Sequence, residues 1–378
     1  MASLDFNRLW LALIAVTLPF LLVHLSADVQ ADTEQARVKL GLWVDQLEVG
    51  PKMNAAGKRL RDSEFVGQDL NRAVFDGCDL DGVRFCQCDL SNASFKNARL
   101  TGTHLDECSI RDADFTNAIV NGILDISLNS AGPHEMNLSE KQLVSTRSYK
   151  TKDLRRCIIG SYKGYQVNPP PKYDFSGAHL DGARLLGEDF TECSFAGAYI
   201  PQIEISDCKI RFDQLASTRY FERDGLSWMV FECVRFDGKV DLSGKNLTGT
   251  VFLSQLLDGS FEGAKITGCT FGPSMTVERL RTTKNYCEGD LSGITLIHAD
   301  LSGCDLSGQN LTGCTFRGCT FTGTSLNNAV VTNAQFIKGK SAGLTLSQLK
   351  ATWNYKNRRM EGLVLPKELL DALSAEKP

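Results

Sequence analysis

The sequence predicts an all-β solenoid, a right-handed quadrilateral β-helix with short helical insertions and a helix at each end. Three residue columns with a period of five predict this fold. A large apolar residue recurs at every fifth position, a small or β-branched residue stands two positions before it, and Gly, Asn or Asp often stands two positions after it. This period fits neither an α-helix, at about 3.6 residues per turn, nor a strand, at 2.

Such a period suits a chain that turns a corner every five residues. Two inward side chains, one large and one small, line each side of a narrow tube, and four sides close a coil of about 20 residues. Coils then stack at the spacing of β-strands, about 4.8 Å. The preceding column must be small because both columns share a close-packed interior. Gly, Asn and Asp suit the corners because they tolerate the left-handed backbone of a turn.

The columns are clearest between residues 63 and 122. The large column holds Phe65, Leu70, Phe75, Leu80, Phe85, Leu90, Phe95, Leu100, Leu105, Ile110, Phe115 and Val120. The small column runs from Ser63 to Ala118 with one exception, Gln68. The corner column holds Gly67, Gly77, Gly82, Asn92, Asn97, Gly102, Asp112, Asn117 and Gly122.

The same register returns twice further along the chain. It runs from Phe175 to Ile210 and from Leu296 to Phe336, with a weaker, slipped stretch from Phe231 to Phe271 between them. We therefore expect one solenoid over residues 59–365, interrupted near 138–172, 211–228, 273–290 and 344–360.

Several of these segments resemble a known family. Ala113-Asp114-Phe115, Ala299-Asp300-Leu301 and Cys304-Asp305-Leu306 are similar to the repeats of the pentapeptide repeat family. The resemblance frames most of residues 56–365 and implies the quadrilateral β-helix. Some members of that family mimic duplex DNA and bind type II topoisomerases, and pairing of two tubes end to end is common among them. The resemblance thus implies a homodimer through one end of the solenoid.

Both ends of the chain differ from the repeats. Residues 1–31 contain an uncharged apolar run, Leu9–Leu25, followed by small residues before Asp32, which predicts a signal peptide or a membrane anchor. Either reading places the remaining chain outside the cytoplasm, in the periplasm or secreted, or anchored to the membrane. Residues 32–58 are predicted to form an N-terminal cap with an amphipathic helix over 32–47, and residues 366–378 a C-terminal helical cap.

The four interruptions resemble one another. They share the segments Gln142–Thr146, Gln214–Thr218, Arg279–Thr283 and Gln348–Thr352, and their leucines are 72, 65 and 69 residues apart. An aromatic residue follows each leucine by six positions. A capping-box pattern, as in Ser139-x-x-Gln142, indicates a short helix that packs its leucine and aromatic against the tube. Two interpretations stay open: corner bulges without a partner, or a row of recognition elements.

The distribution of basic residues favours the second interpretation, a row of recognition elements. The chain carries 41 basic and 45 acidic residues, so its net charge of −4 lacks the basic surplus that is typical of nucleic-acid-binding proteins. Basic residues nevertheless gather in the first and last interruptions. A solvated face is one explanation; the other is an interaction surface for a protein or an anionic envelope surface. The candidate residues are Lys150, Lys152, Arg155, Arg156, Lys356, Arg358 and Arg359.

Cysteine is frequent, with 13 residues, but most occupy the small inward column, where Cys acts as a small hydrophobe. A disulfide between Cys88 and Cys108 stays open because these residues should stack on adjacent coils. Cys86, Cys233 and Cys287 fall outside the column and are expected at the surface.

No motif for catalysis, phosphate binding or metal ligation stands out, so we expect no catalytic, cofactor-binding or metal site and no enzyme activity. The leading function is an exported, non-enzymatic scaffold for a protein or envelope partner. The alternatives are a DNA-mimicking topoisomerase binder and a purely structural spacer.

Overall fold

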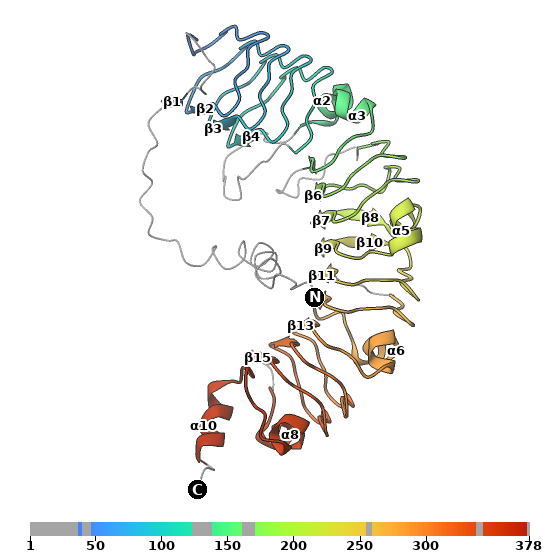
Figure 1. The fold of residues 1–378 in the computed structure, drawn as a ribbon. Helices are drawn as coiled ribbons and strands as arrows, with labels where there is room; N and C mark the ends of the chain where they lie inside the picture. Colours follow the sequence, from blue (N-terminus) through green and yellow to red (C-terminus); the bar gives the residue numbers. More distant parts are fainter. Residues whose placement is uncertain are drawn as a thin grey trace, which may run out of the picture.

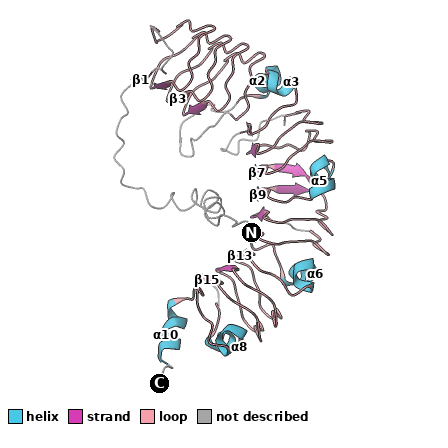
Figure 2. Cartoon of the chain, viewed as in Figure 1, coloured by secondary structure: helices cyan, strands magenta, loops and turns pink. Residues whose placement is uncertain are grey.

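The computed structural model is a curved stack of rectangular coils (Figures 1 and 2). It describes residues 37–39, 47–122, 138–160, 171–254, 259–337 and 343–375. Adjacent coils pair at equivalent positions, as at Arg59 with Asp79 and Asp69 with Asp89, so one coil takes 20 residues. This architecture confirms the predicted all-β solenoid.

One side of each coil carries a short strand, and the strands stack into sheets. The four-stranded sheet contains β1 (Arg37–Lys39), β2 (Glu64–Val66), β3 (Arg84–Cys86) and β4 (His104–Asp106). A nine-stranded sheet follows in the order β5 (Ile158–Gly160), β6 (Arg184–Leu186), β7 (Glu204–Ser206), β9 (Val230–Glu232), β11 (Val251–Phe252), β12 (Thr270–Phe271), β13 (Thr295–Ile297), β14 (Thr315–Arg317) and β15 (Gln335–Ile337). β8 (Lys209–Arg211) and β10 (Arg235–Asp237) form a third, two-stranded sheet. All pairs except β1–β2 are parallel, as stacked coils require.

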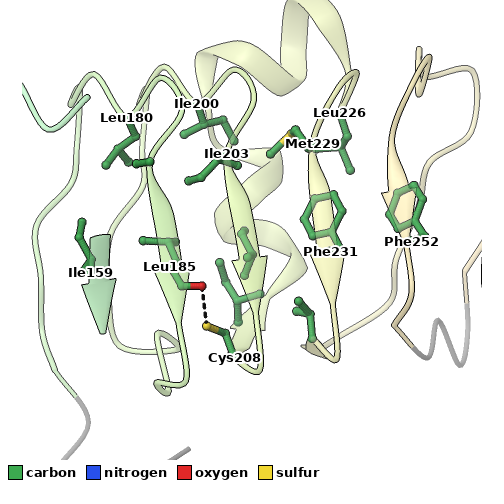
Figure 3. Packing of buried hydrophobic residues seen from close by; sticks show 14 of the residues in the cluster. Ile159, Leu180, Leu185, Ile200, Ile203, Cys208, Leu226, Met229, Phe231 and Phe252 are labelled. Atoms are coloured by element: carbon green, nitrogen blue, oxygen red, sulfur yellow. Dashed lines mark hydrogen bonds between the residues drawn. The ribbon is translucent and has the colours of Figure 1, made fainter. Parts of the chain in front are cut away.

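The interior is filled by the predicted columns. Every large residue from Phe65 to Val120 is at most 2% exposed. Aromatic rings in the same column stack on consecutive coils: the centroids of Phe75 and Phe95 are 5.0 Å apart, and those of Phe95 and Phe115 are 4.9 Å apart. Figure 3 shows the same packing across the middle coils, where Leu185 and Phe231 project inward. Since burying each such side chain contributes about 1.5–3 kcal/mol, the column is a large source of stabilising free energy.

The corners adopt the backbone that the sequence predicts. All nine residues of the corner column between 67 and 122 have φ between 57° and 68°. Gln68, the exception in the small column, is only half-buried, and its side-chain amide donates to the Val66 carbonyl at 2.9 Å.

In the slipped stretch the coil length changes while the column persists. Phe231 pairs with Phe252, 21 positions later, and Phe252 pairs with Phe271, 19 positions later. All three side chains are fully buried. A coil that is one residue longer and a coil that is one residue shorter therefore leave the interior column intact.

At the N-terminal end, the predicted helix over 32–47 is wrong at residues 37–39. Arg37–Lys39 form β1, which pairs antiparallel with β2. The first coil exposes a row of unpaired backbone groups along β2, and a strand satisfies them where a helix would not. Residues 1–36 and 40–46, including the predicted export segment, lie outside the described residues.

At the C-terminal end, α10 (Lys367–Ala375) lies where the sequence predicts a helix after Pro366. Its Leu369 is buried and its Leu373 is partly buried against the core. The helix thereby covers apolar side chains of the last coil.

All thirteen cysteines are free thiols. Burial raises the pKa of Cys157, Cys208 and Cys314 to about 12, so these thiols stay protonated and unreactive near neutral pH. Cys233 and Cys287 are exposed as expected, but Cys86 is buried, because β3 keeps its side chain stacked between those of Val66 and Asp106 on the neighbouring coils.

Replacing a central large residue by a charge should unfold neighbouring coils. Leu306 is 1% exposed and has no water to solvate a carboxylate, so Leu306→Asp should cost several kcal/mol and lower the melting temperature sharply. Thr322→Asp, at an exposed corner of the next coil, is the control and should leave the melting temperature nearly unchanged. A stable Leu306→Asp variant would contradict the buried column.

Replacing Cys88 by Ala should be nearly silent. Cys88 and Cys108 are unbridged thiols on adjacent coils, so the expected loss is below about 1.5 kcal/mol, less than the 2–5 kcal/mol that losing a native disulfide costs. Thermal unfolding of purified protein checks this. A large drop in melting temperature that also appears when the wild type is reduced would show a disulfide.

Candidate functional site

Four helix pairs project from the solenoid, one at each predicted interruption. The pairs are α2 (Glu140–Ser145) with α3 (Arg147–Lys150), α4 (Phe212–Ala216) with α5 (Arg219–Asp224), α6 (Val277–Thr282) with α7 (Lys284–Cys287), and α8 (Leu346–Ala351) with α9 (Trp353–Lys356). Figure 1 shows them along the outer, convex edge of the curved stack, opposite the strands of the nine-stranded sheet. We call this set the helix-pair row.

All four pairs attach to the same corner of the coil. The first residue of each second helix donates its backbone N–H to an alanine carbonyl of the preceding coil. These bonds join Arg147 to Ala118, Arg219 to Ala198, Lys284 to Ala264 and Trp353 to Ala329, at 2.9–3.1 Å. The structure thus brings the four interruptions into one line, as the recognition-row interpretation requires.

The pairs recur at every third coil. Two ordinary corners separate each pair from the next: Gly177 and Gly197, then Gly244 and Gly263, then Gly308 and Asn328. With about 4.8 Å per coil, successive pairs are about 14 Å apart and the row extends over roughly 43 Å. The unequal spacings of 72, 65 and 69 residues therefore encode one equal spacing in space.

A buried threonine joins the two helices of each pair. Thr352 ends α8 and begins α9: its hydroxyl donates to the Leu349 carbonyl at 2.7 Å and accepts from the Tyr355 N–H at 3.2 Å. Thr146, Thr218 and Thr283 make the same two bonds in the other pairs. The preceding leucine of each motif is at most 2% exposed, so the predicted packing of the leucines is confirmed.

The glutamine of the motif has two roles. Gln142 completes the predicted capping box with Ser139, and its side-chain amide also donates to the carbonyls of Ile110 and Ala113 on the preceding coil. Gln348 makes equivalent bonds to Phe321 and Thr324. The second role ties these helices to the tube and could not be read from local spacing; the third pair has Arg279 in place of the glutamine.

Two of the predicted basic residues are held by carboxylates. Lys152 contacts Asp174 at 2.9 Å, and its hydrogen bond lowers the pKa of that carboxyl to about 2. Arg155 binds Asp153 through two bonds of 2.7 and 2.8 Å, and this bond lowers the pKa of Asp153. These two cations are therefore less available to a partner than the sequence suggests.

The other predicted residues stay exposed. Lys150 and Lys356 occupy equivalent positions in the first and last pairs, and each donates its ammonium to a corner asparagine at 2.8 Å. Arg359 lies over the Trp353 ring, 5.8 Å from its centroid. Arg156 and Arg358 sit at corners with φ of 57° and 55°.

The two basic groups do not form one cluster, because they belong to the end pairs of the row. Residues 139–156 hold six basic and two acidic side chains, and residues 345–359 hold four basic and none acidic. The middle segments, 211–228 and 276–290, each hold three of both signs.

Sequence reasoning missed a set of equivalent cations. The residue directly after the joint threonine is Arg147, Arg219 or Lys284 in three of the pairs, and all three are exposed. Aligning the four interruptions on their threonines would have revealed it.

Within the described ranges, no three His, Cys, Asp or Glu side chains gather closely enough to hold a metal ion. None of the helices in the same part of the chain is long and apolar enough to cross a membrane.

Removing the joint hydroxyl should destabilise a helix pair. Thr352→Val keeps the shape of the side chain but removes the acceptor of the Tyr355 N–H and one of the two bonds to the Leu349 carbonyl, so we expect a loss of about 1–3 kcal/mol. Thr352→Ser retains both bonds and should lose clearly less. Chemical denaturation of the two variants checks this, and equal losses would assign the effect to packing alone.

Comparison with known families agrees with this architecture. Models of pentapeptide repeats match residues 174–211 and 290–338 in eight copies, and a model of a pentapeptide repeat region matches residues 59–129. No curated protein matches the chain.

Among solved structures, HetL, a pentapeptide repeat protein involved in heterocyst differentiation regulation from the cyanobacterium Nostoc sp. strain PCC 7120, is 18% identical. The match covers 73% of this chain and 90% of HetL, with a TM-score of 0.16. QnrB1, a plasmid-mediated fluoroquinolone resistance protein, is 14% identical over 62% of this chain and 91% of its own, with a TM-score of 0.18. On the repeat matches and the stacked five-residue columns, the chain belongs to the pentapeptide repeat family.

Proposed function

We propose that this protein is a non-enzymatic scaffold that holds a protein partner along the helix-pair row. The observation that carries the proposal is the regularity of the row: four pairs on one corner, each three coils from the next. A partner that touches more than one pair gains affinity from every further contact, because later contacts form within the same complex.

Each pair combines constant buried residues with variable residues further out, and this combination supports the proposed function. The joint threonine and the leucine are buried in all four pairs, and they fix the helices to the tube. The position directly after the leucine varies among the four pairs: it is Val144, Ala216, Arg281 and Lys350. A constant frame with variable outer residues is what a surface for contacts requires.

The charged coils at the N-terminal end do not favour DNA mimicry. Several of their carboxylates are paired with cations on neighbouring coils: Asp79 and Asp81 with Arg61, and Glu64 and Asp106 with Arg84. A DNA mimic needs a continuous row of unpaired negative charge to imitate phosphates. We therefore prefer the scaffold to the topoisomerase binder.

Location follows from the sequence of residues 1–31, which we propose to be an export signal or membrane anchor. The partner would then be a component of the cell envelope. Fractionation of tagged protein tests this part separately: soluble cytosolic protein with Met1 intact would remove it and leave the row unaffected.

Site-specific photo-crosslinking tests the row. A photoreactive amino acid placed at Val144, Glu222, Cys287 or Ser347, one exposed position per pair, should capture the same partner species in cells. Arg317 on β14 and Gln335 on β15, exposed positions of the nine-stranded sheet opposite the row, are the controls and should not capture it. Excess unlabelled wild-type protein should compete with all four. Capture that is equal at the control positions would refute the row as the binding surface.

A further inference from the structure

A line of cations runs along the helix-pair row. Arg147, Arg219 and Lys284 occupy one equivalent position, and each is fixed to the tube by the same backbone hydrogen bond. The fourth pair has Trp353 at this position, but the Arg359 guanidinium lies over its ring and restores a positive charge there. One cation therefore stands at each step of about 14 Å.

Three of the four cations are free to bind an anion. Among the described residues, no carboxylate lies within ion-pair distance of Arg147, Arg219 or Arg359. Lys284 has one weak contact, 3.8 Å to Glu288, with both side chains more than half exposed. Such an exposed pair contributes little and is easily exchanged for another partner.

Two of these guanidiniums are held in place by aromatic rings. Arg219 lies 5.6 Å from the centre of the Tyr199 ring, and Arg359 lies 5.8 Å from that of Trp353. A ring restrains the side chain, while the N–H groups at the edge of the guanidinium remain open to a carboxylate. Preorganised cations of this kind lose less entropy on binding.

The spacing fits an extended polypeptide. Side chains of an extended chain return to the same face at every second residue, and four residues span about 13.6 Å, close to the step of about 14 Å between pairs. The row lies on the convex edge of the stack (Figure 1). A flexible extended segment can follow a convex line, whereas a flat membrane would touch only part of it.

From these observations we infer that the partner contributes an extended acidic segment, with carboxylates about four residues apart, that runs along the helix-pair row and binds its line of cations. This inference rests on the proposed function and specifies the chemistry of the partner. Since the two middle pairs are neutral overall, local placement of the cations rather than net charge directs the binding.

The test uses two labelled synthetic peptides of equal length and equal Glu content, built on Gly and Ser. One peptide carries Glu at every fourth position and the other at every third. Fluorescence anisotropy at low ionic strength should show that the wild type prefers the first peptide, with affinity that falls as salt is added.

The row variant combines Arg147→Glu, Arg219→Glu, Lys284→Glu and Arg359→Glu, and should bind at least about tenfold more weakly. Its control combines Lys58→Glu, Arg72→Glu, Lys239→Glu and Arg317→Glu, four exposed cations outside the helix pairs, and makes the same change in net charge. The control should lose less than about threefold. If charge reversal lowers the melting temperature, Gln at the same four row positions replaces Glu.

Three results would overturn the inference: equal losses in the row variant and its control, no binding of either peptide at low salt, or binding to phosphatidylglycerol vesicles without binding to the peptides. The last would assign the cations to an anionic membrane. Each of these results is compatible with successful crosslinking along the row, so failure of the acidic segment can be told apart from failure of the scaffold.

Discussion

The fixed rise from coil to coil is the constraint on which the molecule depends. Backbone hydrogen bonds set neighbouring coils one strand spacing apart, and stacked rings such as Phe65 and Phe85, with centroids 5.0 Å apart, fill the interior at the same interval. Coil length can vary, as between Phe231, Phe252 and Phe271, provided that each large side chain returns to its column. Changes in coil length therefore fall outside the buried column.

The helix pairs are such changes at a corner. Each pair leaves the tube and returns to it without interrupting the column, because its leucine enters the core and its threonine satisfies the backbone groups at the joint. In three of the pairs, the side chain of Gln142, Gln214 or Gln348 then secures the pair by hydrogen bonds to carbonyls of the preceding coil. Added segments that keep the rise keep the stack, so the rise also fixes how far apart the pairs stand.

Because the rise from coil to coil is fixed, equivalent residues of the four interruptions lie at regular intervals. Residues that follow the joint threonine, such as Arg147 and Arg219, belong to separate repeats but lie on one line at equal intervals. The charges that the sequence makes most prominent behave differently, since Lys152 and Arg155 are neutralised by Asp174 and Asp153. Position on the row, rather than local abundance of basic residues, decides which cations can face a partner.

The sequence by itself determined the solenoid, its buried columns, its corner residues and the presence of four similar interruptions, because a strict local period reports directly on which side chains face inward. Contacts between coils decided the rest. Whether Arg37–Lys39 forms a strand depends on the open edge of β2, the burial of Cys86 depends on its neighbours in the stack, and the alignment of the four pairs depends on coils that close between them. Such long-range pairing leaves no local pattern, so only the tertiary structure could show it.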